Sequence, residues 1–230
     1  LGTRVFHDFN LNDLVDYIDW TPFFQSWQLI GQYPKIFENE IVGEEAKKLF
    51  ADAQIMLEDI LDRKIFQAKG VIGFWKANSE NETIEVEANG SILQLHHLRV
   101  QVDRKGKEQL SLSDFIAPKS SGVEDYIGGF AVTTGHGVKE YVDAFKENLD
   151  DYSAILAEAL ADRLAEAFAE KMHHLVRTEF WGFDRGESLS NEELIKEKYR
   201  GIRPAPGYPA CPEHTEKGTL WELLEDPESS

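Results

Sequence analysis

The sequence predicts an α+β fold, with a twisted, mainly antiparallel sheet and long flanking helices. Three observations support this prediction. Segments typical of strands, either apolar throughout or alternating apolar and polar, gather between residues 70 and 134. Segments with the apolar period of helices lie on both sides of that cluster. Because the strands are grouped and do not alternate one by one with helices, the order favours α+β over a repeated βαβ fold.

The chain before the strands is expected to be helical. Residues 11–27 carry five large aromatic side chains, which are Tyr17, Trp20, Phe23, Phe24 and Trp27. Within this stretch, Thr21 is expected to cap a helix that begins at Pro22, since a hydroxyl accepts from free N–H groups and proline suits the first helical position. A second helix is predicted over Gly43–Arg63, where apolar residues recur at helical spacing.

Four strands are predicted in the middle of the chain. Gly70–Trp75 is a short apolar run typical of a buried strand, and Thr83–Glu87 alternates like a half-exposed one. Ser91–Val102 and Tyr126–Thr134 are the third and fourth strands. The residues from Leu110 to Pro118 are expected to form a loop with one turn of helix.

The clearest helical pattern runs from Asp150 to Trp181, where apolar residues recur every three or four positions. At about 1.5 Å per residue, a helix of this extent is on the order of 40 Å long. The segment Ser190–Glu193 then offers capping side chains for a shorter helix that ends near Tyr199.

The composition limits the partners. The 230 residues include 24 basic and 42 acidic side chains, which give a formal net charge of −18. This balance disfavours nucleic acid, whose phosphates are bound by clustered lysine and arginine. No apolar run approaches the roughly 20 residues that span a bilayer, so no membrane partner is expected. The one cysteine, Cys211, cannot form an internal disulfide, which favours a reducing, cytoplasmic location.

The common motifs of metal and nucleotide sites are missing from the sequence. Histidines occur as adjacent pairs at 96–97 and 173–174, and the members of such a pair point in different directions. Cys211 and His214 lack the second pair of ligands that a structural zinc ion needs, so no metal site is expected. Gly135–Gly137 follows a strand, but no Lys-Ser/Thr pair comes after it and the third glycine of the dinucleotide spacing is missing. No Gly-x-Ser-x-Gly elbow occurs either, and no catalytic residue is assigned.

Two segments carry unusual chemistry, and the first is an acidic stripe. Asp162, Glu166 and Glu170 recur every four residues on the long predicted helix and are therefore expected to share one face. Such a stripe is consistent with a solvated helix face. Because neighbouring like charges repel one another, it is also consistent with a cationic ligand or partner opposite them.

The second is the segment Gly201–Pro212, which has four prolines in its last nine residues. Proline fixes φ and removes a donor, so this stretch is expected to be an extended, pre-ordered loop. Within it, Gly207 allows close approach of a ligand, Arg203 offers a planar fork for a carboxylate, and Tyr208 offers a ring face and a hydroxyl. A rigid connector would explain the prolines but not these three residues.

From Arg203 to Glu216 the sequence reads RPAPGYPACPEHTE, which closely resembles the C-terminal activation domain of cobalamin-dependent methionine synthase. Three more segments resemble the same domain in the same order. They are YIDWTPFF at 17–24, DYIG at 125–128 and ADRLAEAFAE at 161–170. The resemblance extends from about residue 10 to residue 225 and includes several long motifs in register.

By this resemblance the domain binds S-adenosylmethionine (AdoMet). The parent enzyme transfers a methyl group from methyltetrahydrofolate to homocysteine through cobalamin. The domain restores methylcobalamin by reductive methylation after the cobalamin has been oxidised to cob(II)alamin. The implied partners are the cobalamin-binding domain of the same chain and a flavodoxin or flavoprotein reductase as electron donor.

Carried over onto this sequence, the AdoMet contacts of the family fall on Asp19 and Arg203, with the loop backbone at Ala205 and Tyr208. AdoMet presents an ammonium, a carboxylate and a sulfonium, and therefore calls for an anion, a cation and an oxygen or aromatic face. Asp19 suits the ammonium and Arg203 the carboxylate, while the loop backbone around Gly207 suits the adenosine.

Asp162 and Glu166 match family positions on the helix that faces the cobalamin domain, and they complete the candidate cofactor-binding set. The family domain continues beyond the position of Ser230 and includes a further tyrosine at AdoMet. The chain also begins at Leu1 without a methionine or a signal segment. Residues 1–230 are therefore expected to be an AdoMet-binding activation domain that is truncated at its C-terminal end and excised from a larger multidomain chain.

Two alternatives remain open. An AdoMet-dependent methyltransferase acting alone would have a doubly wound sheet with a glycine-rich loop after its first strand, and no such loop is present. An interaction module would dock on the cobalamin domain without binding AdoMet.

Overall fold

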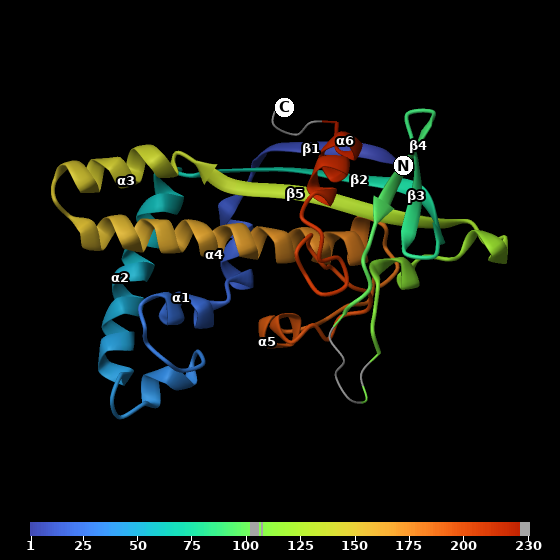
Figure 1. Ribbon diagram of the computed structural model, residues 1–230. Helices are drawn as coiled ribbons and strands as arrows, with labels where there is room; N and C mark the ends of the chain where they lie inside the picture. Colours follow the sequence, from blue (N-terminus) through green and yellow to red (C-terminus); the bar gives the residue numbers. More distant parts are fainter. Residues whose placement is uncertain (102–105, 107, 226–230) are drawn as a thin grey trace. The chain divides into compact units, whose positions relative to one another are not determined.

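A computed structural model describes residues 1–101, 106 and 108–225 of the chain (Figure 1). The chain divides into two compact units. The first, called the sheet unit, comprises Leu1–Phe6, Gly70–Ala131 and the chain from Gly201 onward. The second, called the helical unit, comprises His7–Lys69 and Val132–Arg200.

The strands form a five-stranded sheet, which confirms the predicted mainly antiparallel α+β fold. Its order is β1-β2-β3-β4, and β5 also pairs with the long β2. The β2–β3 and β3–β4 pairs are antiparallel, with Thr83 opposite Glu80 in one and opposite His96 in the other. The strand bounds are Gly2–Phe9 for β1, Gln67–Glu80 for β2, Thr83–Ala88 for β3, Ser91–His96 for β4 and Asp125–His136 for β5.

Local sequence explains the β3–β4 hairpin. Asn89 and Gly90 both have positive φ, at 49° and 77°, as a type I′ turn between twisted strands requires. In β3, Ile84 and Val86 are fully buried, while Glu85 between them is only partly buried. These side chains form a core with the buried faces of β2 and β4 and with α6, Glu216–Leu223, which packs against β4.

The helical unit is organised around the long helix α4. In Figure 1, α3 (yellow) folds back along α4 (orange), and the two helices pack together. At one side, Thr134 Oγ1 donates to the Ala161 carbonyl at 3.0 Å, and the Phe9 ring lies 4.6 Å from the Phe168 ring. The helices are α1 Trp20–Ser26, α2 Gly43–Asp62, α3 Val138–Glu147, α4 Asp151–Leu175 and α5 Asn191–Ile195.

The aromatic N-terminal stretch forms much of the packing beside α2. The rings of Trp20, Phe23, Phe24 and Phe50 contact one another with centroids 4.9–6.3 Å apart, mostly edge to face. Phe23 and Phe24 are almost completely buried. The aromatic density that the sequence shows in residues 11–27 therefore serves the core.

Several expectations need correction. Helix α1 begins at Trp20 and is capped by Asp19, so the prediction of Thr21 as cap and Pro22 as first residue is wrong by two positions. The third strand ends at His96, six residues before Val102, and Val102 itself lies outside the described residues. The last turn of the long helix, Val176–Phe180, is a π-helix, and α5 ends at Ile195, four residues before Tyr199.

Among the strands and α-helices of the described residues, β1, α3 and α6 were not predicted, and neither were the short 3-10 helices at Leu11–Tyr17, Lys35–Glu38 and Lys119–Ser121. The remaining predicted helices and strands agree with the structure within a few residues, and the loop after β4 contains the expected helical turn at Leu112–Phe115. Among the described helices, none combines the length and the apolar character needed to cross a membrane.

Candidate functional site

The proline-rich segment forms a compact loop that is closed by its own backbone. Gly207 N–H donates to the Cys211 carbonyl at 2.8 Å, and Cys211 N–H donates to the Tyr208 carbonyl at 3.0 Å. The Ala205 carbonyl accepts from Tyr208 N–H and from the buried Cys211 thiol, each at 3.0 Å. Burial raises the pKa of this thiol, which keeps the donating form. The shape of the loop thus depends on backbone groups and one buried side chain.

The same loop is attached to the rest of the sheet unit. Leu112 N–H donates to the Ala210 carbonyl at 2.9 Å. Gly207 has φ of 107°, and a Cβ at this position would lie 2.4 Å from Cε1 of His214. The imidazole therefore packs directly on the glycine, so no larger residue fits there without rearrangement.

The side chains that the loop presents differ in exposure. Tyr208 is 59% exposed, and its ring is available to a ligand. Arg203, five residues earlier in the chain, is half-buried, and Ala205 is exposed. A cation and an aromatic face therefore occur within six residues. This set can recognise a ligand with a carboxylate and a flat ring.

Asp19 has a structural function as well as its predicted one. Its carboxylate accepts from Thr21 N–H at 2.9 Å and so caps α1. The Thr21 hydroxyl in turn accepts from Tyr33 N–H at 3.2 Å. Asn191 donates to the Ile18 carbonyl at 3.1 Å, which fixes the chain just before Asp19. The cap leaves the second carboxylate oxygen of this half-buried side chain for another cation or donor.

The acidic stripe on α4 is shorter than expected. Asp162 and Glu166 are exposed and lie one turn apart. Glu170 is turned toward the interior, where its carboxylate lies 3.9 Å from Nη1 of Arg177 and its side chain is only 12% exposed. Two exposed acids therefore remain on this face of the helix.

The seven predicted residues fall into two groups. Arg203, Ala205, Gly207 and Tyr208 lie together in one loop of the sheet unit. The other three, Asp19, Asp162 and Glu166, belong to the helical unit, where they lie on two different elements.

Sequence reasoning missed a buried ionic cluster in the helical unit. Arg177 is fully buried and makes two short bonds to Glu187, at 2.5 and 2.7 Å. Its Nη1 donates to Nδ1 of His173 at 2.6 Å, and its guanidinium lies 4.2 Å from the Tyr199 ring centroid. The signal that could have found it is an arginine within the apolar period of the long helix. This cluster ties the residues after α4 back to that helix.

The described residues contain no group of three or more histidine, cysteine, aspartate or glutamate side chains that could hold a metal ion. Gly137 has φ of 86° and precedes α3, and a Cβ there would lie 2.1 Å from the Ile65 carbonyl oxygen. The glycines at 135–137 therefore form a tight corner against the backbone.

Comparison with known proteins adds to this geometry. Residues 10–230 match the family described as vitamin B12 dependent methionine synthase, activation domain. A crystal structure of the MetH reactivation domain bound to AdoHcy is similar, with a TM-score of 0.92 and 52% sequence identity. The match covers 98% of this chain and 70% of that chain.

Proposed function

The chain belongs to the activation domain family of vitamin B12-dependent methionine synthase, and from this premise we propose that it binds AdoMet and supports the reductive methylation of cob(II)alamin to methylcobalamin. The observation that carries the proposal is the 52% identical relative with AdoHcy bound. AdoHcy is AdoMet without the transferred methyl group and its sulfonium charge, so a site for one offers the contacts to the amino, carboxylate and adenosine groups that the other also needs.

The residues of this chain support that ligand. The Arg203 guanidinium suits the carboxylate of the methionine part, because a planar fork can donate two hydrogen bonds to it. The loop backbone at Ala205 and Gly207, with the exposed Tyr208 ring, suits the adenosine. The free oxygen of the Asp19 carboxylate suits the ammonium. AdoMet supplies the methyl group, and the chain binds and orients it.

Asp162 and Glu166 serve a different contact in this proposal. They are exposed on α4 and offer a charged surface to the cobalamin-binding domain of the same polypeptide. Cobalamin belongs to that domain, and a flavodoxin or flavoprotein reductase delivers the one electron that cob(II)alamin needs before it accepts the methyl group. Catalysis is shared between domains, so the isolated chain has no turnover of its own.

The proposed location is the cytoplasm. The only cysteine, Cys211, is a buried free thiol that donates a hydrogen bond, a state that a reducing compartment preserves. In the full enzyme, the activation domain is one module of a longer polypeptide.

Calorimetric titration of AdoMet into the 230-residue chain tests the proposal, first alone and then with the cobalamin domain added. Binding in either condition supports it. Loss of binding in both would favour an interaction module that docks without AdoMet. Methylation of a free acceptor in the absence of cobalamin would favour an independent methyltransferase.

A further inference from the structure

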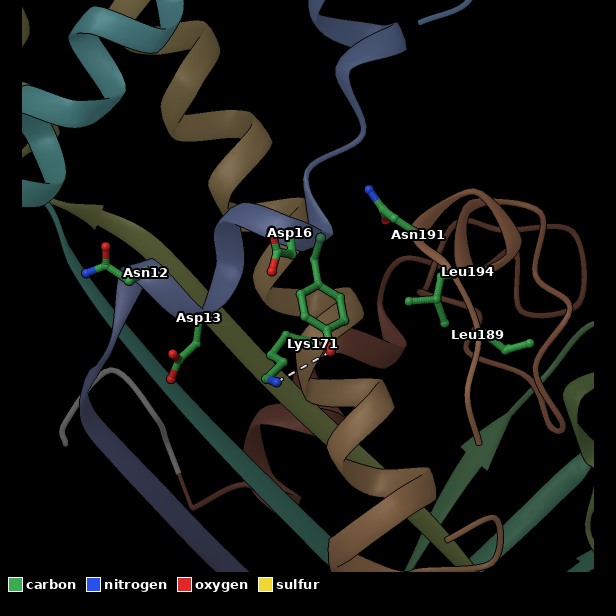
Figure 2. Close-up of a pocket in the computed structure, with 8 residues that line it drawn as sticks. Asn12, Asp13, Asp16, Lys171, Leu189, Asn191 and Leu194 are labelled. Atoms are coloured by element: carbon green, nitrogen blue, oxygen red, sulfur yellow. Dashed lines mark hydrogen bonds between the residues drawn. The ribbon is translucent and has the colours of Figure 1, made fainter. Parts of the chain in front are cut away.

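The helical unit contains a pocket of about 360 Å³ that the proposed function does not use (Figure 2). It lies between the helical turn η1 (Leu11–Tyr17), the helix α4 and the segment around α5. Its volume is near the lower end of the roughly 300–1,000 Å³ typical of small-molecule sites. The pocket is therefore large enough for a ligand of about the size of an amino acid.

One wall of the pocket is acidic. Asp13 and Asp16 both come from η1, and in Figure 2 both lie on the left, away from Leu189 and Leu194. Asp13 accepts one long hydrogen bond from Asn10, at 3.3 Å. Within the described part of the chain, no lysine, arginine or histidine nitrogen lies within 4.0 Å of either carboxylate. The wall thus offers two carboxylates to a cation.

The middle of the pocket carries a cation and a phenol. Lys171 donates to the Tyr17 hydroxyl at 3.4 Å, and its ammonium lies 4.9 Å from the centroid of the same ring. Tyr17 is held from behind by Nδ1 of His174, 2.6 Å from its hydroxyl oxygen. Among the described residues, no carboxylate lies within 4.0 Å of the Lys171 ammonium, although the chain has a net charge of −18. This ammonium is therefore available to an anion.

The third wall carries two leucines and an asparagine. Leu189 and Leu194 lie on the side opposite the two aspartates in Figure 2. Asn191 stands between the two leucines in the sequence, and its Nδ2 donates to the Ile18 carbonyl at 3.1 Å. Its Oδ1 is buried without a hydrogen-bond partner in the described structure. Two leucines and one unused acceptor complete the lining on this side.

We propose that this pocket binds a small zwitterionic α-amino acid with an apolar side chain. The ammonium pairs with Asp13 and Asp16, the carboxylate pairs with Lys171 and the Tyr17 hydroxyl, and the side chain packs on the leucine wall. A metal cation would be repelled by Lys171, and a simple anion by the two aspartates. Only a ligand with both charges satisfies the three groups together.

This site is separate from the acidic face of α4. Lys171 follows Glu166 by five residues, which places it about 140° further round a helix of 3.6 residues per turn. A ligand in the pocket and a partner on the Asp162 and Glu166 face therefore contact different sides of α4.

The test uses L-norleucine as the probe, with pentylamine and hexanoate as analogues that lack its carboxylate and its ammonium. Calorimetry or ligand-observed NMR on the 230-residue chain is expected to detect L-norleucine at millimolar concentration and to find each analogue at least about tenfold weaker, the equivalent of about 1.4 kcal/mol. Equal binding of L-norleucine and either analogue overturns the proposal, as does the absence of L-norleucine binding.

Matched variants locate the site. Lys171→Met keeps the length of the side chain, and Asp16→Asn keeps its shape. Each variant is expected to bind L-norleucine at least about tenfold more weakly. Lys139→Met, on a side chain that is 81% exposed on α3, is the control and should leave the affinity unchanged. Circular dichroism checks that the variants fold. If both pocket variants bind L-norleucine with the affinity of the unsubstituted chain, the assignment of the site is overturned.

AdoMet also carries an α-amino-acid end, so a competition arm separates the two sites. L-norleucine and AdoMet are expected to bind independently, and Arg203→Ala should weaken AdoMet without affecting L-norleucine. If AdoMet displaces L-norleucine, the pocket is part of the AdoMet site and the separate site is overturned. If AdoMet fails to bind while L-norleucine binds, the proposed function fails and the pocket stands.

Discussion

Each compact unit buries a titratable side chain, Arg177 in the helical unit and His97 in the sheet unit, and the two are accommodated differently. The helical unit buries a full charge, Arg177, and compensates it with Glu187, whose side chain is only 2% exposed. The sheet unit buries an imidazole, His97, with no hydrogen-bond partner for either ring nitrogen among the described residues. Burial lowers the pKa of His97 to about 4, so it is uncharged at neutral pH. Arg177 is therefore buried as a paired charge, whereas His97 is buried as a neutral ring.

The two units also differ in which groups form the structural hydrogen bonds around their candidate binding residues. In the sheet unit the loop that carries Arg203 is closed by backbone hydrogen bonds and by the buried Cys211 thiol. In the helical unit Asp19 caps a helix, and Arg177 and Glu187 are part of the interior. Substitutions there change stability and function together unless the replacement keeps the hydrogen bond.

The largest effect is expected at the buried ion pair. Glu187→Ala leaves the Arg177 guanidinium buried without its carboxylate and is expected to lower the free energy of unfolding by about 3–5 kcal/mol. Chemical denaturation measures this. Glu166→Gln, on the exposed face of α4, is the control and should change stability by less than about 0.5 kcal/mol. A loss at Glu187 no larger than the control would show that the cluster is dispensable.

Acid should act mainly on the sheet unit. The folded pKa of His97, about 4, is below the unfolded value of 6.5, so the unfolded chain binds the extra proton as the pH falls through this window. Stability is complete above pH 6.5 and decreases below it, by up to about 2 kcal/mol at pH 5. Denaturation of His97→Leu between these pH values should show a much flatter dependence. The exposed His136→Gln is the control, and an unchanged slope in His97→Leu would contradict the assignment.

The Arg203 prediction tests whether the loop is a binding element. Charge-assisted hydrogen bonds contribute about 1.5–3 kcal/mol, so Arg203→Ala should weaken AdoMet by about one to two orders of magnitude. Arg203→Lys should recover only part of the loss, because a point charge cannot reproduce the planar fork. Calorimetric titration compares the three proteins, and denaturation should show equal stability. Equal AdoMet affinities would remove Arg203 from the site.

Asp19 allows its two functions to be separated. Asp19→Asn keeps an oxygen that can accept from Thr21 N–H, so helix α1 should retain its stability, whereas Asp19→Ala should lose about 1 kcal/mol. Both variants lose the charge and should weaken AdoMet to a similar extent. Normal AdoMet affinity in Asp19→Asn would mean that the carboxylate is only a cap.

The smallest effect on stability is expected at Asp162 and Glu166. Both are exposed, so replacing them with Asn and Gln should change the free energy of unfolding by less than about 0.5 kcal/mol. In the full-length enzyme, the double variant should slow reductive methylation while primary turnover and AdoMet affinity stay the same. Unchanged reactivation would identify the two as ordinary surface acids.

Much of the fold could be predicted because the evidence for it is local. Helix α2 begins at Gly43 as predicted, and β3 begins at Thr83, since apolar period and turn residues lie within the element itself. Helix α3 was missed because it directly follows β5, and the glycines at the corner were interpreted as a loop. The π-helical end at Val176–Phe180 was missed because apolar spacing indicates a helix but does not distinguish its backbone hydrogen-bond pattern.

The sequence by itself determined the sheet-and-helix architecture, the presence of an ordered proline-rich loop and the family, because apolar period, proline content and the order of motifs are properties of the chain. It predicted that loop as extended, whereas the structure closes it with hydrogen bonds among Gly207, Tyr208 and Cys211. Tertiary structure decided that Glu170 turns inward to Arg177 while Glu166 stays exposed. It also decided that Tyr17 meets His174, 157 positions away, to form the polar pocket. A side chain with several possible partners takes the one that packing brings within hydrogen-bond distance, and that distance is a property of the folded chain.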